Sequence, residues 1–81
     1  MIKVGQIYKE NRWVYTITHI ENGVFRDMNR VFLILPNGSM MTEKVETFNQ
    51  EVEQKEVEFI AEYPTWQEAV NSEYFQKEDE E

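Results

Sequence analysis

The side chains best suited to chemistry are one histidine and a set of closely spaced glutamates. His19 is the only histidine among the 81 residues, so the chain cannot supply a two-histidine metal site. A general base also needs an orienting partner, and Asp27 could reach His19 across a hairpin. Because His19 ends an alternating stretch that places it on one face with Trp13, Tyr15 and Ile17, we interpret it as a structural residue.

The glutamates of the second half occur as pairs of carboxylates. Glycoside hydrolases hold such pairs in a shaped cleft with perturbed pKa values, whereas acids at alternate positions of an exposed strand form a solvated face. The sequence contains no P-loop, calcium loop or G-x-S-x-G motif. It therefore predicts no catalytic residue, metal site or cofactor, and the acids become candidate protein-binding residues. They are Glu51, Glu53, Glu56, Glu58 and Glu62.

Basic and aromatic side chains are interleaved in the first half. Bases stack on aromatic rings while cations contact phosphates, so this pattern supports an alternative function, a nucleic-acid-binding SH3-like barrel. Most aromatic residues of so small a domain are needed for its core, which favours the protein-binding interpretation. The residues of the alternative site are Arg12, Trp13, Arg26 and Arg30.

Charge is distributed unevenly along the chain, whose net charge is −8. Residues 1–42 contain three acids and five bases, a net charge of +2, and residues 43–81 contain thirteen acids and three bases, a net charge of −10. Such a chain repels phosphate and suits a basic partner instead. We therefore predict a non-enzymatic, acidic interaction module that binds a protein with a basic surface. Nucleic-acid mimicry is a sharper version, which requires the five candidate glutamates to form one row on one surface.

The chain has no cysteine and no apolar run that approaches the length of a membrane span. No apolar segment follows the first charges, as it would in a signal peptide. We predict a cytoplasmic protein without membrane contact, as a monomer or weak dimer.

Most of the first half predicts short strands joined by turns. Residues 13–20 are rich in β-branched and aromatic side chains on both faces, which indicates a central strand. Asn22-Gly23 predicts a tight hairpin turn, and Pro36-Asn37-Gly38 predicts another. Gly5 marks a bend or a close backbone approach. The predicted strands are 3–9, 13–20, 24–28, 31–35 and 40–41.

The middle of the chain is open to two interpretations. Val45, Phe48 and Val52 recur at helical spacing behind Thr42, a potential N-cap, so residues 43–54 form either a short helix or a loop. Residues 56–63 then alternate as an edge strand. Its predicted inward residues are Val57, Phe59, Ala61 and Tyr63, and Ile60 marks a covered patch on the other side.

A helix follows at about residues 65–75. Thr65 and Glu68 form a capping box, and Pro64 keeps the preceding residue out of the helix. The apolar stripe of Trp66, Ala69, Val70 and Tyr74 requires a surface to cover, and we predict that Trp66 anchors the helix on the sheet.

Together these elements predict a mainly β fold, a small antiparallel SH3-like barrel or curved sheet with one C-terminal α-helix packed on it. We expect a single domain over residues 1–76, with the helix at about 65–75. Residues 77–81 are expected to form a disordered acidic tail.

Three segments, "VGQIYK", "YTITHIENG" and "YPTWQEAVNSEYF", resemble those of small uncharacterised phage and prophage proteins of Gram-positive bacteria. The strongest match covers residues 62–75 and a weaker one covers residues 4–23. The resemblance implies an accessory gene of phage origin and a bacterial host cytoplasm. It implies no catalytic or binding residue.

Overall fold

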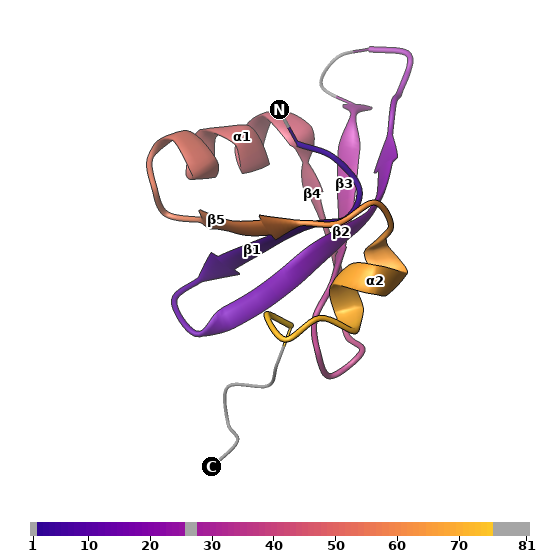
Figure 1. Ribbon diagram of the computed structural model, residues 1–81. Coiled ribbons are helices and arrows are strands. Elements are labelled where there is room, and N and C mark those ends of the chain that lie inside the picture. Colours follow the sequence, from indigo (N-terminus) through magenta and orange to yellow (C-terminus); the bar gives the residue numbers. More distant parts are fainter. Residues whose placement is uncertain (1, 26–27, 76–81) are drawn as a thin grey trace.

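Five strands form one antiparallel sheet in the computed structural model, which describes residues 2–25 and 28–75 (Figure 1). The elements are β1 (Gln6–Glu10), β2 (Trp13–Glu21), β3 (Arg30–Ile34), β4 (Met40–Lys44), α1 (Val45–Glu53), β5 (Glu58–Glu62) and α2 (Trp66–Val70). The strand order is β4-β3-β2-β1-β5, so β4 and β5 are the two edges and the sheet is open. The predicted mainly β, antiparallel fold is confirmed, whereas closure into an SH3-like barrel is not confirmed.

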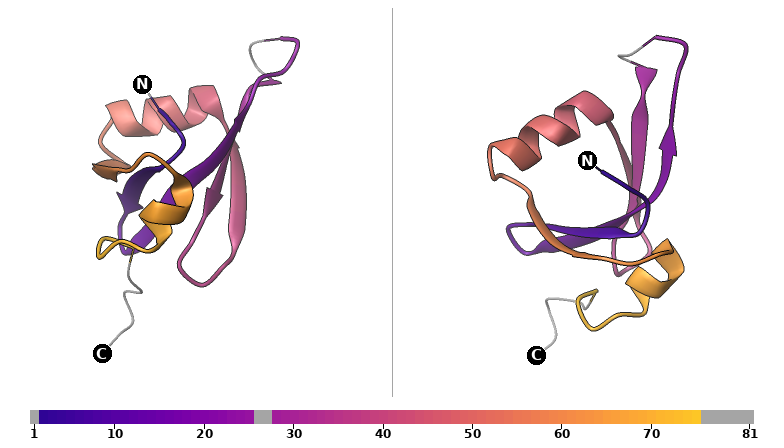
Figure 2. Two further views of the ribbon diagram at one scale, coloured as in Figure 1. Left: turned by 45° about the vertical axis from the view of Figure 1, so that its right-hand side comes forward. Right: turned by 45° about the horizontal axis from the view of Figure 1, so that its top comes forward.

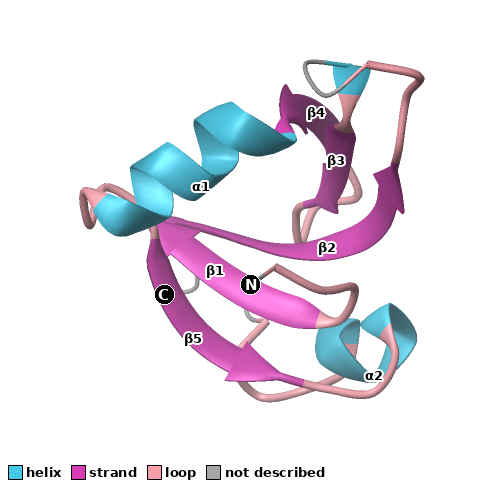
Figure 3. Ribbon diagram, turned by 90° about the horizontal axis from the view of Figure 1, so that it is seen from above, coloured by secondary structure: helices cyan, strands magenta, loops and turns pink. Residues whose placement is uncertain are grey.

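Both faces of the central strand β2 are buried. Tyr15 and Ile17 belong to a cluster on the α1 face, and Val14 belongs to a second cluster with Ala69 of α2. Each helix covers a different face of the sheet (Figure 3). The central position predicted for residues 13–20 is therefore confirmed, and it explains why β2 carries apolar side chains on both faces.

Helix α1 settles the interpretation of residues 43–54 in favour of a short helix. Phe48 is fully buried, and the centroid of its ring lies 5.0 Å from that of Tyr8, with the two rings nearly perpendicular. Thr42 is not its N-cap, because the ladder between β3 and β4 continues to the Arg30–Lys44 pair and holds Thr42 within β4. The helix begins at Val45 after Lys44, which makes no side-chain capping bond.

Helix α2 begins as predicted and ends early. The Thr65 side chain accepts a hydrogen bond from the Glu68 N–H at 3.2 Å, which confirms the N-cap. The helix stops at Val70 rather than near residue 75, and the following turn returns Phe75 to the core with 6% of its surface exposed. Trp66 is half-buried and belongs to neither buried cluster, whereas Ala69 is fully buried, so the structure does not confirm that Trp66 anchors the helix.

The connection between β2 and β3 differs from the prediction. Glu21 of β2 pairs with Arg30 of β3, so a tight turn at Asn22-Gly23 and a strand at 24–28 are wrong. The register is set instead by Val31 and Leu33, which are fully buried. The described residues of this connection, 22–25 and 28–29, extend beyond the sheet (Figure 2). Arg26 and Asp27 lie outside the described residues.

Two glycines have the roles that the sequence predicts. Gly5 has a φ of +95°, and a Cβ at this position would lie 2.2 Å from the Tyr63 carbonyl oxygen. The close backbone approach is therefore confirmed. Gly38 has a φ of +92° in the turn between β3 and β4, which confirms the Pro36-Asn37-Gly38 turn. The predicted tail, residues 77–81, lies outside the described residues.

The edge strand near residue 60 is confirmed as β5, with an interruption. Val57 is buried and Ile60 packs against the α2-side cluster, as predicted. Phe59, predicted to face inward, is 48% exposed although its ring lies 5.7 Å from that of Tyr8. The register with β1 shifts between Ile7 and Tyr8, which leaves Ile60 as an extra residue beyond Phe59. The shift therefore leaves Phe59 on the face of Val57 and moves Ala61 and Tyr63, also predicted to face inward with Val57, to the α2-side cluster.

Candidate interaction surface

The five candidate glutamates occupy three different elements. Glu51 and Glu53 lie in α1, Glu56 lies in the turn that follows, and Glu58 and Glu62 begin and end β5. All except Glu51 are exposed. Four exposed acids thus surround the α1–β5 turn and the edge of the sheet, but only two lie on a strand.

The irregular register of β5 separates its two acids. Glu62 pairs with Gln6 and Glu58 pairs with Lys9. Because successive residues of β1 point to opposite faces, Gln6 and Lys9 face opposite ways and so do their partners. The single row that nucleic-acid mimicry requires is not formed.

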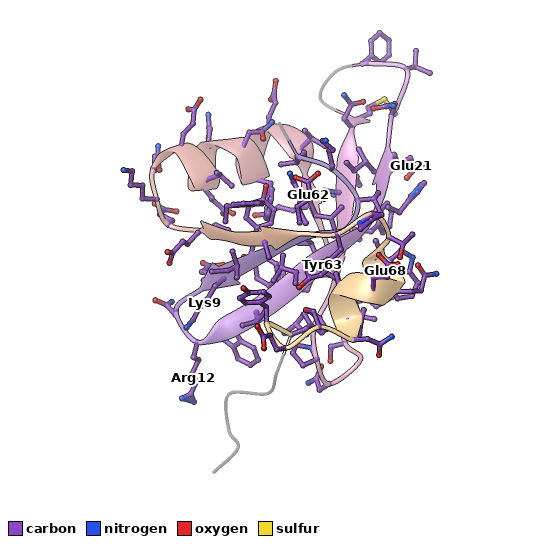
Figure 4. The ribbon with its side chains drawn as sticks, in the orientation of Figure 1. Lys9, Arg12, Glu21, Glu62, Tyr63 and Glu68 are labelled. Atoms are coloured by element: carbon purple, nitrogen blue, oxygen red, sulfur yellow. The ribbon has the colours of Figure 1, made fainter. Side chains whose placement is uncertain are left out.

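Glu62 fastens the N-terminal segment to the sheet. Its carboxylate lies 3.3 Å from the Lys3 Nζ and accepts from the Gln6 Nε2 at 3.4 Å (Figure 4 shows its position). The Lys3 contact and then the Gln6 bond lower the pKa of Glu62. Gln6 in turn accepts from the Tyr8 hydroxyl at 2.9 Å. Burial first, and the Glu62 charge second, raise the pKa of Tyr8.

Glu51 belongs to a group of acids that the sequence does not reveal. Its carboxyl hydrogen-bonds that of Glu43 on β4, and Glu10 of β1 lies near enough to add its charge. Burial, then the Glu51 bond and the Glu51 and Glu10 charges raise the pKa of Glu43 to about 7. The hydroxyl of buried Tyr15 donates to Glu10 at 3.0 Å, and burial followed by this bond raises the pKa of Tyr15.

Glu43 can therefore keep its proton near neutral pH and donate it in the hydrogen bond to Glu51, which links α1 to β4. Two carboxylates in contact repel unless one carries a proton, so this link weakens when both ionise. The spacing of these acids along the sequence does not predict the Glu43–Glu51 contact, because β1, β4 and α1 come together only when the sheet forms.

The basic and aromatic candidates lie at opposite ends of β2. Arg12 lies in the β1–β2 turn and Trp13 begins β2, whereas Arg30 pairs with Glu21 at the far end. Figure 4 shows Arg12 and Glu21 at these two ends. A nine-residue strand spans up to about 26 Å. Within the described residues, the structure does not bring these side chains into one platform.

His19 faces away from the residues with which we predicted it to share a face. The register between β2 and β3 shifts between Ile17 and His19, which leaves Thr18 as an extra residue. His19 therefore pairs with Phe32, and their rings lie 5.5 Å apart. The predicted shared face is wrong, and Asp27, its expected partner, lies outside the described residues.

Within residues 2–25 and 28–75, no group of three or more histidine, aspartate or glutamate side chains is arranged to hold a metal ion. None of the helices in this part of the chain is long and apolar enough to cross a membrane. The chain matches no family model, and comparison with curated proteins and with solved structures gave no match.

Proposed function

We propose that the protein is a small, non-enzymatic, acidic interaction module that binds a protein with a basic surface. The observation that carries this proposal is the charge around α1 and the turn that follows it. Residues 45–58 contain five glutamates and one lysine. Phe48 faces the core, and Glu46, Glu53 and Glu56 are exposed to solvent.

Glu46 was not among the predicted residues, but in the described part of the chain no ion pair neutralises it, Glu53 or Glu56. Glu62 contacts Lys3, and Glu51 is half-buried against Glu43. Charges held on a packed helix keep a fixed geometry, which favours oriented encounter with a basic partner. The surface that we propose therefore consists of Glu46, Glu53 and Glu56, with Glu58 at its border.

The proposal also includes the origin of the protein and the type of its β fold. A phage origin, and with it a bacterial host cytoplasm, is supported by the resemblance over residues 62–75. An SH3-like barrel opened between β4 and β5 is supported by the strand order, in which β5 returns across the sheet to pair with β1.

The test replaces the three acids together by glutamine. Affinity capture from a bacterial lysate at low and high salt supplies a partner, and surface plasmon resonance then measures its association rate. We expect Glu46→Gln/Glu53→Gln/Glu56→Gln to slow association by about tenfold at low salt and to flatten the salt dependence, because steering by opposite charges is lost.

A matched control removes the same charge elsewhere. Glu21, Glu68 and Glu73 are exposed and lie away from α1. Their triple glutamine variant is expected to associate almost as fast as the parent. Equal association rates for the parent and both variants at low salt would contradict the proposal.

A further inference from the structure

The two edges of the sheet are protected to different degrees. Natural edge strands avoid unwanted pairing through bulges and charges. β5 has both, with an irregular register and an acid at each end, Glu58 and Glu62. β4 pairs with β3 in regular register over all five of its residues. Two of these, Met40 and Met41, are 58% and 38% exposed. β4 is therefore the edge with the stronger tendency to pair.

Two backbone hydrogen bonds set the phase of the β3–β4 ladder. The Leu35 N–H donates to the Ser39 carbonyl at 2.9 Å, and the Val45 N–H donates to the Asn29 carbonyl at 3.1 Å. Hydrogen-bonded pairs alternate with non-bonded pairs along an antiparallel ladder. Both bonds fit the register of β3 and β4, so the residues of β4 that bond to β3 are the odd-numbered ones.

The even-numbered residues of β4 consequently direct their N–H groups to the open edge. The backbone N–H and C=O groups of Met41 and Glu43 bond to β3, and those of the residues on either side of them point to the open edge. The outward residues are Met40, Thr42 and Lys44, all of which are exposed. Outward-pointing backbone groups therefore occur at every second residue of β4. The hydrogen-bonded pairs of an antiparallel ladder have the same spacing, so a further strand could pair here without any change in the sheet.

The strand is also complementary to itself. When two copies run antiparallel with Thr42 opposite Thr42, Met40 of one copy lies opposite Lys44 of the other, and Met41 lies opposite Glu43. No like charges meet in this register. The strand carries one glutamate and one lysine, so two chains of net charge −8 would meet at a segment with no net charge.

We propose that β4 pairs with β4 of a second copy, which joins two sheets into one across a two-fold axis at Thr42. Such an isologous contact closes on itself and produces a dimer rather than a polymer. One short strand pair buries little surface, so the dimer is weak and forms as concentration rises.

Sedimentation velocity tests this across about a hundredfold range of protein concentration. We expect the parent to shift from monomer to dimer. Thr42→Pro is expected to stay monomeric, because proline removes an N–H that faces the open edge and leaves the bonds to β3 intact. Thr42→Val retains the N–H and the branched side chain, and is expected to dimerise as the parent does.

Thr42→Glu provides a second variant that leaves the backbone unchanged. It places two carboxylates opposite each other across the axis, so we expect a monomer at low salt and partial recovery of the dimer at high salt. Circular dichroism verifies that each variant is folded. The proposal fails if the parent is monomeric throughout, if it grows beyond a dimer, or if Thr42→Pro and Thr42→Glu associate like the parent.

Discussion

Replacing Glu43 by glutamine should make the protein more stable above neutral pH and leave it nearly unchanged under mildly acidic conditions. The pKa of Glu43 rises from 4.5 to about 7 in the folded protein because of burial, the bond to Glu51 and the nearby negative charges. Between pH 4.5 and pH 7 the unfolded chain releases this proton while the folded chain keeps it. The free energy of unfolding therefore falls as pH rises across this window. Glutamine resembles the protonated acid and does not ionise.

The magnitude follows from the two pKa values. Their difference corresponds to at most about 3.4 kcal/mol, since one pKa unit is about 1.36 kcal/mol. Glu43 is only half-buried, and water screens its interaction with Glu51 and Glu10. We therefore expect the free energy of unfolding of Glu43→Gln to exceed that of the parent by about 1 to 2 kcal/mol at high pH. Glu51→Gln should produce a smaller gain, because it removes the repulsion within the pair but leaves the burial of Glu43, the largest cause of its raised pKa.

Urea unfolding followed by circular dichroism at a series of pH values between 5 and 8 measures this difference. Glu46→Gln is the matched control, because it removes one charge from the exposed side of α1. Parallel profiles of the free energy of unfolding against pH for Glu43→Gln and Glu46→Gln would refute the raised pKa of Glu43. The same conclusion would follow if Glu43→Gln were less stable than the parent at high pH.

Two further predictions concern packing. Gly5→Ala should destabilise the fold by about 2 kcal/mol or more, because its Cβ would collide with the Tyr63 carbonyl. Gly38 has open space around it, so Gly38→Ala should cost only about 1 kcal/mol of backbone strain. Comparable thermal midpoints for the two would contradict the close approach. Phe75→Ala should cost about 3 to 5 kcal/mol and Tyr74→Ala much less, because Phe75 is 6% exposed and Tyr74 is 47% exposed. Thermal unfolding measures both, and equal losses would mean that Phe75 does not close the core.

Features decided by short stretches of chain could be predicted from the sequence. The turn at Gly38 and the cap at Thr65 depend on backbone conformations and bonds within a few residues. The central position of residues 13–20 follows from apolar side chains on both faces. The spacing of Phe48 and its apolar neighbours indicated α1 but left a loop as the alternative, and it did not give the first residue of the helix.

The candidate sites depended on pairing between distant strands. A single extra residue reverses the direction of every side chain beyond it, and such residues interrupt β2 near Thr18 and β5 near Ile60. The first moves His19 to another face, and the second places Glu58 and Glu62 on opposite faces.

By itself, the sequence determined a small, acidic, mainly antiparallel β protein with a capped helix on its sheet, because periodicity, turn residues and caps act over a few neighbouring residues. Only the tertiary structure decided which acids are exposed and which lie close to one another. Glu10, Glu43 and Glu51 are far apart along the chain and meet because the sheet brings β1, β4 and α1 together. The same long-range pairing leaves β4 with an unprotected edge and β5 with a protected one.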